Sequence, residues 1–191
     1  MGINLSKGER INLSKEAPSL KKVGVGLGWD TNTTDTGTDF DLDASVFMLG
    51  ADGKIPNEKN FIFYNNLSSP DGGVKHTGDN LTGAGDGDDE QIIVKLNDLS
   101  TQYQKVIFVV QIYKGVENKQ HFGQVKNAFI RAVDATGKEM VRFNLSGTGQ
   151  YDNQRSLLFA ELVREAGDWK FNAVGSASPS DSFVEWLKQY S

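Results

Sequence analysis

The sequence predicts an all-β protein: a β-sandwich of two mainly antiparallel sheets with a short C-terminal helix. Three observations favour this fold class. Nine or ten short runs rich in β-branched and aromatic residues follow one another along the chain. Turn formers such as Gly, Asn and Asp separate these runs. A clear helix start signal appears near the C-terminus. Because no linker or change of composition divides the chain, we expect one domain over residues 1–191.

The chain opens on a short internal repeat. Residues 3–7 recur as residues 11–15, and both copies alternate apolar and polar side chains. Alternation with a period of two is typical of strands, and two copies eight residues apart fit a hairpin better than a solenoid. We therefore expect two paired strands, closed by Pro18.

Residues 23–30 form the next expected strand. One face carries Val23, Val25, Leu27 and Trp29. The other face carries only glycines, which indicates that a backbone or a bulky side chain packs closely there. The spacing differs from that of nucleotide-binding glycine loops, and turn formers rather than a helix follow it. Asp30 could face the same rim of the sandwich as Asp39.

Acidic and apolar residues alternate in the strand expected over residues 39–48. Asp39, Asp41 and Asp43 share one face, and the apolar residues Phe40, Leu42, Ala44, Val46 and Met48 share the other. Beyond Asp43 the first face becomes apolar as well, because it continues with Phe47 and Leu49. The strand is therefore expected to have one acidic end and to be buried on both sides beyond it.

The second half of the chain continues in strands. Further strands are expected over residues 61–64, 91–96, 105–113, 127–133, 140–145 and 169–174, and residues 74–77 lead into the acidic loop. Residues 105–113 are apolar on both faces, which marks a central strand. Residues 156–165 fit a helix or a strand by periodicity, and the turn after them favours a hairpin. Ser182 and Glu185 fit a capping box at the start of the final helix, whose apolar residues are expected to seal one edge of the sheets.

The acidic loop, residues 78–90, concentrates side chains that could bind a metal ion. It holds five carboxylates, one amide, one hydroxyl and four glycines, and no Lys or Arg. Clustered acids repel one another unless they are solvated or share a cation. Ca²⁺ takes about 6–8 oxygen ligands from carboxylates, amides, carbonyls and water. A solvated acidic loop without a ligand is the alternative.

The loop is not an EF-hand. Residues 79–90 have the required length of twelve, but Leu81 and Gly83 stand where side-chain oxygens are needed. Ala84 stands at the position that requires Gly. The neighbouring acidic strand end nevertheless favours metal binding, and the clustered carboxylates could hold two cations. The expected side-chain ligands are Asp39, Asp41, Asp43, Asp79, Asn80, Thr82, Asp86, Asp88, Asp89 and Glu90, with the carbonyls of Leu81 and Gly83.

Composition excludes several functions. A net charge of −5 argues against a nucleic-acid binder. The absence of Cys excludes disulfides, thiolate zinc sites and dithiol redox chemistry. With two His residues and no Cys, the chain offers few of the ligands that zinc sites use. Without an apolar run of about 18 residues we expect no membrane insertion, and without the apolar core of a signal peptide we expect a cytoplasmic protein.

Several motifs, taken in order, resemble the TerD family of tellurium-resistance and stress-response proteins. They are residues 28–30, 37–45, 61–65, 76–90 and 122–131, with a similar opening and a similar segment at 169–175. The resemblance implies a two-sheet β-sandwich that binds two Ca²⁺ ions in the bacterial cytoplasm. It also implies other Ter proteins and a TerC-type membrane protein as partners.

The chemistry favours a protein that is not an enzyme. Tellurite reduction requires thiols, a flavin or a redox metal. The chain has no Cys, and Ca²⁺ has no redox chemistry, so a direct reductase is not expected. Paired carboxylates could serve a hydrolase, but metal ligation explains an all-acid loop better. We expect a calcium-dependent scaffold or sensor. The alternative is a Ca²⁺-dependent module that adheres to a membrane or a ligand.

Overall fold

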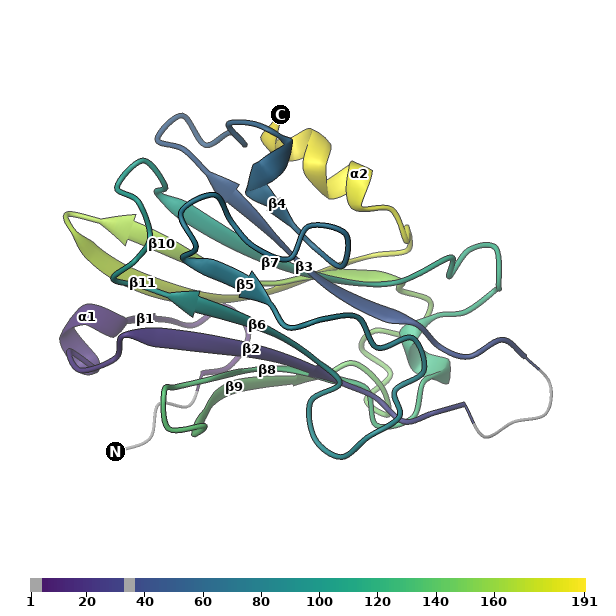
Figure 1. The fold of residues 1–191 in the computed structure, drawn as a ribbon. Coiled ribbons are helices and arrows are strands. Elements are labelled where there is room, and N and C mark those ends of the chain that lie inside the picture. Colours follow the sequence, from purple (N-terminus) through teal and green to yellow (C-terminus); the bar gives the residue numbers. More distant parts are fainter. Residues whose placement is uncertain (1–4, 33–36) are drawn as a thin grey trace.

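The computed structural model describes residues 5–32 and 37–191, and its strands form two sheets that lie face to face (Figure 1). The strand pairs within both sheets are antiparallel. The predicted fold class, a mainly antiparallel β-sandwich with a short C-terminal helix, is therefore confirmed. Within the described residues, no helix is both long and apolar enough to span a membrane.

The larger sheet has six strands in the order β1-β11-β10-β7-β3-β4. Their bounds are Arg10–Asn12 (β1), Asp168–Ser178 (β11), Ser156–Glu165 (β10), Lys105–Ile112 (β7), Leu42–Leu49 (β3) and Phe61–Ile62 (β4). The smaller sheet has five strands in the order β5-β6-β2-β8-β9. Their bounds are Val74–His76 (β5), Glu90–Lys95 (β6), Lys22–Gly28 (β2), Phe129–Val133 (β8) and Glu139–Asn144 (β9). The helical segments are Leu13–Glu16 (α1), Glu58–Asn60 (η1), Phe122–Gln124 (η2), Phe183–Leu187 (α2) and Lys188–Tyr190 (η3).

The main core lies between the sheets, because each strand turns an apolar row inward. Val23, Val25 and Leu27 of β2 are fully buried in this core, as their alternation predicts. Strand β7 lies between β10 and β3, and its residues 106–112 are buried on both faces. This confirms the central strand predicted from the sequence. The hairpins β8–β9 and β10–β11 are confirmed as well.

The C-terminal helix α2 covers a face of the six-stranded sheet and not an edge, so the prediction that it seals an edge is wrong. Phe47, Ile107 and Leu158 point away from the main core and form a second cluster with Trp186. Trp186 Nε1 also donates a hydrogen bond of 2.9 Å to Ser156 Oγ. The outer side chains of the central strands need a cover, and α2 supplies it. Ser182 caps this helix as predicted, by accepting a hydrogen bond from Val184 N.

The N-terminal repeat does not form the expected hairpin. Part of its first copy lies outside the described residues, and Leu5 makes an isolated bridge with Val141 of β9. The second copy is divided between β1, which pairs with β11, and α1. Asn12 accepts a hydrogen bond from Lys15 N, so it caps a helical turn where the alternating pattern predicted a continuing strand. The two copies therefore attach to different sheets.

Several expected strands are shorter than predicted, and the differences at β4 and β3 bear on the acidic residues. Strand β4 ends at Ile62, because Phe63 turns back and exchanges backbone hydrogen bonds with Asn66. Strand β3 begins at Leu42, so Asp39 and Asp41 lie before the strand and not within it. Because β4 pairs only with Val46 and Phe47, the start of β3 has no strand neighbour on that side.

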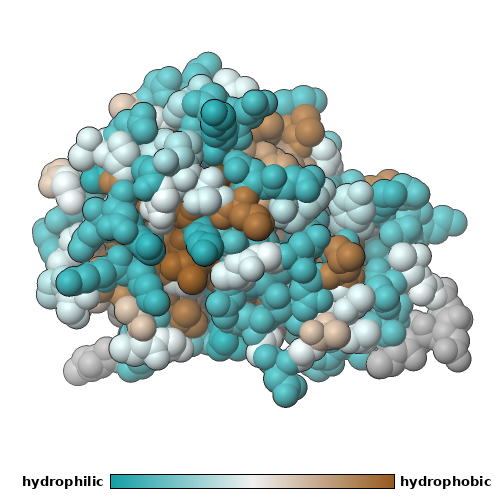
Figure 2. Space-filling view, in the orientation of Figure 1, coloured by the Kyte–Doolittle hydropathy of each residue, from teal (hydrophilic) through white to brown (hydrophobic). Residues whose placement is uncertain are grey.

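The visible surface is mostly hydrophilic, with small apolar areas between polar side chains (Figure 2). Among the described residues, the large apolar side chains that are exposed are Leu67, Leu81, Tyr113, Val116 and Val184. They come from several loops and from α2. The face in Figure 2 therefore shows no broad apolar surface.

The glycine face of β2 is packed closely, as predicted. A Cβ atom at Gly24 would touch Val133, and one at Gly26 would overlap the carboxylate of Asp88. At Gly28 it would lie 2.5 Å from the ring of Phe129 and 2.8 Å from the carbonyl oxygen of Gly87. The glycines thus allow β8 side chains and the acidic loop to lie directly on the sheet.

Replacing Gly28 by Ala should lower the free energy of unfolding by about 1–3 kcal/mol, because a ring and a backbone carbonyl must move to admit the methyl group. Urea denaturation measures the change. Gly37→Ala is the control, because its nearest neighbour would be the side chain of Asn32 at 3.7 Å. We expect that substitution to change the stability by less than about 0.5 kcal/mol. Equal effects of the two substitutions would contradict close packing at Gly28.

Candidate metal centre

Three carboxylates from distant parts of the chain meet at one end of the sandwich. Asp41 directly precedes β3, Asp43 lies within it, and Asp79 follows β5 of the other sheet. One oxygen of each carboxylate lies within 4.8 Å of those of the other two. We call Asp41, Asp43 and Asp79 the acidic cluster. It joins the start of β3 to the acidic loop.

Two of these carboxylates have buried oxygens without a partner. Asp43 is 2% exposed, and neither its Oδ2 nor Oδ1 of Asp41 accepts a hydrogen bond. Burial, followed by the charges of Glu90, Asp41 and Asp79, raises the pKa of Asp43 to about 8. Burial, followed by the charges of Asp79 and Glu90, raises the pKa of Asp41 to about 7. The cluster is thus unfavourable while ionised and alone, which is the condition that a bound cation relieves.

Glu90 closes the open edge of β3. It is fully buried, and its carboxylate accepts hydrogen bonds from Ala44 N at 2.8 Å and Asn80 N at 3.3 Å. His76 Nε2 lies 3.4 Å from the same carboxylate and 3.2 Å from the carbonyl oxygen of Ala44. Two side chains of the five-stranded sheet therefore bond to Ala44 where β3 lacks a strand neighbour.

The tautomer of His76 follows from its surroundings. Its Nδ1 accepts a hydrogen bond of 3.1 Å from the backbone N–H of Gly78, so the proton of the neutral ring lies on Nε2. That proton points toward the carbonyl of Ala44 and the carboxylate of Glu90. Burial raises the pKa of Glu90, and the hydrogen bond from His76 opposes this shift. Oε2 of Glu90 thus links the two sheets through Ala44, and Oε1 holds the start of the acidic loop through Asn80.

Asn80 and Asp89 fasten the acidic loop to the end of β2. Asn80 Oδ1 accepts hydrogen bonds from the backbone N–H groups of Thr82 and Gly83, at 3.2 and 3.0 Å. Asn80 Nδ2 donates to Asp89 Oδ1, and Asp89 Oδ2 accepts from Trp29 N at 2.9 Å. These contacts give the loop its shape.

Asp88 forms an ion pair with Arg131. Its oxygens accept hydrogen bonds of 2.8 and 3.1 Å from Arg131, and its side chain is 3% exposed where it lies over Gly26. Arg131 also contacts Glu139, which pairs with Arg142 in turn. The carboxylate of Asp88 thus points to the outer face of the five-stranded sheet.

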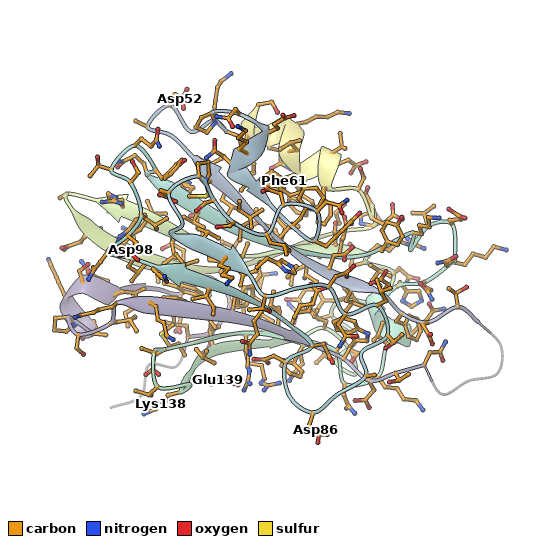
Figure 3. All side chains as sticks on the ribbon, viewed as in Figure 1. Asp52, Phe61, Asp86, Asp98, Lys138 and Glu139 are labelled. Atoms are coloured by element: carbon orange, nitrogen blue, oxygen red, sulfur yellow. The ribbon has the colours of Figure 1, made fainter. Side chains whose placement is uncertain are left out.

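Asp39 and Asp86 are not part of the acidic cluster. Asp86 is exposed at the tip of the loop, where Figure 3 shows it pointing away from the sheets. Asp39 is exposed, and its carbonyl oxygen accepts a hydrogen bond from Gln120. The side chain of Leu81 is exposed, Thr82 is half-buried, and the carbonyl of Gly83 accepts from Thr31 Oγ1 at 3.3 Å.

Sequence reasoning missed three residues near the two acidic stretches. Arg131 of β8 pairs with Asp88 of the acidic loop, and Gln111 of β7 lies opposite Asp43. The ring of Tyr64 lies 6.4 Å from that of Tyr113, whose backbone N–H donates to the carbonyl oxygen of Asp41. Burial, followed by the charge of Asp43, raises the pKa of Tyr64. A signal for Gln111 was present, because it is the polar residue within an otherwise apolar buried strand.

The donors fit a hard divalent cation. Carboxylate oxygens are the ligands that Ca²⁺ prefers, and the chain offers no thiolate. The fold and the site define an all-β sandwich with an acidic cluster at one end. A family model described as the TerD domain matches residues 1–190. The chain belongs to the TerD family.

Named relatives agree with this membership. The chain is 47% identical to the tellurium resistance protein TerX of Serratia marcescens, over the full length of both. It is 52% identical to TerD of the same organism, over 92% of this chain and 90% of that protein. It is 48% identical to general stress protein 16U of Bacillus subtilis, over 92% and 91% of the two chains.

Solved structures show the same fold. A homologue of the telluride resistance protein TerD from Streptomyces coelicolor superposes with a TM-score of 0.75 at 24% sequence identity. The match covers 90% of this chain and 98% of that chain. The family is thus one of tellurium-resistance and stress-response proteins.

Proposed function

We propose that this TerD-family protein binds Ca²⁺ at the acidic cluster and acts as a calcium-dependent scaffold or sensor, without enzymatic activity. The observation that carries the proposal is the convergence of Asp79 with the half-buried Asp41 and the buried Asp43, each of which has a buried oxygen without a hydrogen-bond partner. A bound cation would accept those oxygens and cancel the repulsion between the acids.

The consequence of binding follows from where the ligands lie. Asp41 and Asp43 are held by β3, whereas Asp79 belongs to the acidic loop. An ion shared between them would tie the loop to the six-stranded sheet, next to the bonds that Glu90 and His76 make with Ala44. A partner that recognises the ordered loop would then bind only the calcium-loaded form. This is how a protein without catalytic groups could transmit a calcium signal.

The acidic cluster would hold one ion. The second Ca²⁺ expected from the sequence remains a proposal, and the stoichiometry of a calorimetric titration tests it. The same titration in the presence of Mg²⁺ separates the two cations, because Mg²⁺ requires nearly ideal octahedral geometry and dehydrates reluctantly.

Calcium binding should release protons at pH 6.5. With the pKa of Asp43 raised to about 8 and that of Asp41 to about 7, both carboxyls hold protons in much of the metal-free protein at that pH. The cation must displace them. Calorimetry in two buffers with different ionisation enthalpies measures the release as a difference in the observed heat. Equal heats in the two buffers would contradict protonated carboxyls at this site.

The same shifts set the pH dependence of the metal-free protein. Between the ordinary pKa of 3.8 and about 8, the folded state holds protons on Asp43 that the unfolded state has lost. Stability must therefore fall as the pH rises through this window, since the unfolded state binds fewer protons. Saturating Ca²⁺ should reverse this contribution at pH 8. Urea denaturation at several pH values, in EDTA and in calcium, measures how the free energy of unfolding changes with pH in each condition.

A further inference from the structure

A glutamine in the central strand lies beside the acidic cluster. Gln111 of β7 is directly opposite Asp43 of β3 and, on its other side, opposite Ser156 of β10. It is 4% exposed. Asp43, Gln111 and Ser156 thus form a polar row across three strands, next to the apolar cluster under α2.

The two ends of the Gln111 amide differ in their surroundings. The side chain lies across the strand pair from Asp43, and its interaction with that carboxylate opposes the rise in the pKa of Asp43. Its carbonyl oxygen, Oε1, is buried and has no hydrogen-bond partner. Buried amide oxygens nearly always have a partner, so an unpaired one on the residue opposite Asp43, whose Oδ2 is unpaired too, requires an explanation.

We propose that Oε1 of Gln111 is a neutral fourth side-chain ligand of the cation held by Asp41, Asp43 and Asp79. This inference rests on the proposed function. Amide oxygens are ordinary Ca²⁺ ligands. With a divalent cation, three carboxylates already leave a net charge of −1, and a fourth buried carboxylate would add repulsion that an amide does not.

The position of Gln111 also gives it a role in selecting the ion. Asp43 and Gln111 lie opposite each other on the paired strands β3 and β7, so backbone hydrogen bonds fix their separation. Ligands held in this way cannot easily contract to the short, regular octahedron of Mg²⁺, which needs distances of about 2.0–2.1 Å. The amide oxygen thus belongs to the rigid part of the site, and Asp79 to its loop part.

Terbium luminescence tests the inference directly. Tb³⁺ replaces Ca²⁺ at oxygen sites, and its lifetimes in H₂O and D₂O report the number of coordinated waters. Tyr113 donates its backbone N–H to the carbonyl oxygen of Asp41, and the ring of Tyr64 lies 6.4 Å from that of Tyr113, so these tyrosines can sensitise the ion. We expect Gln111→Met, which removes the oxygen at similar volume, to gain about one coordinated water. Its Ca²⁺ affinity should fall by about tenfold or more.

Two further variants separate ligation from support. Gln111→Glu keeps an oxygen at the site but removes the N–H donor, so its number of coordinated waters should equal that of the wild type. Gln104→Met changes a glutamine that directly precedes β7, at the end of the strand away from Gln111, and should alter neither the water count nor the affinity. An unchanged water count in Gln111→Met would overturn the proposal, as would equal gains of water in the Met and Glu variants. A wild-type protein that binds no Tb³⁺ would refute the proposed function itself.

Discussion

Replacing Glu90 by Ala should lower the free energy of unfolding by about 3–5 kcal/mol, measured in EDTA so that no metal contributes. The carboxylate is fully buried and accepts hydrogen bonds from Ala44 and Asn80, with His76 beside it. Its removal leaves these buried donors without an acceptor and separates β3 from the five-stranded sheet. Each lost partner is costly, because a buried unpaired donor cannot bond to water.

The control for Glu90 is an exposed acid of the same type. Glu117 is exposed in the loop after β7, so Glu117→Ala should change the stability by less than about 0.5 kcal/mol. The double variant with His76→Ala should cost less than the sum of the two single changes, because the two residues share one network. A loss below about 1 kcal/mol for Glu90→Ala would contradict its role in joining the sheets.

Replacing Asp43 by Asn should have opposite effects with and without calcium. In EDTA at pH 8 the variant should be at least as stable as the wild type, because a buried carboxylate surrounded by like charges has been made neutral. In calcium it should lose the stabilisation that a bound ion provides, about 2.7 kcal/mol when the ion is at a hundredfold excess over Kd. Thermal unfolding under both conditions measures the two effects.

Asp98→Asn is the matched control for this pair of measurements. Asp98 is exposed and lies far from the acidic loop, as the positions of Asp98 and Asp86 show (Figure 3). Its variant should keep the full calcium response. If Asp43→Asn responded to calcium as the wild type does, the acidic cluster would not be the binding site.

Local patterns were sufficient to predict much of the fold. The alternation in residues 39–48 fixed which side chains of β3 face the core, and the bare face of β2 indicated close packing. Both predictions follow from the alternation of side chains along a strand, which depends only on residues that are close in the sequence. The N-terminal repeat shows the limit, because Asn12 can cap a helical turn as well as continue a strand.

The candidate site was predictable only in part, because its geometry depends on contacts between distant residues. Asp41, Asp43 and Asp79 meet as the acidic stretches suggested. Asp88, by contrast, pairs with Arg131, which lies 43 residues away on β8. Glu90 bonds to the backbone of Ala44, which lacks a neighbouring strand because β4 is short. Composition identifies an acid-rich loop, but strand register decides which acids remain free of protein partners.

The most direct test of the central claim is a crystal structure of the calcium-loaded protein with anomalous diffraction to locate the ion. We expect an anomalous peak between Asp41, Asp43 and Asp79, with carboxylate oxygens at about 2.3–2.6 Å. The Oε1 atom of Gln111 should lie within the same range. Calcium bound elsewhere, or a cluster that stays free of metal in saturating calcium, would contradict the account.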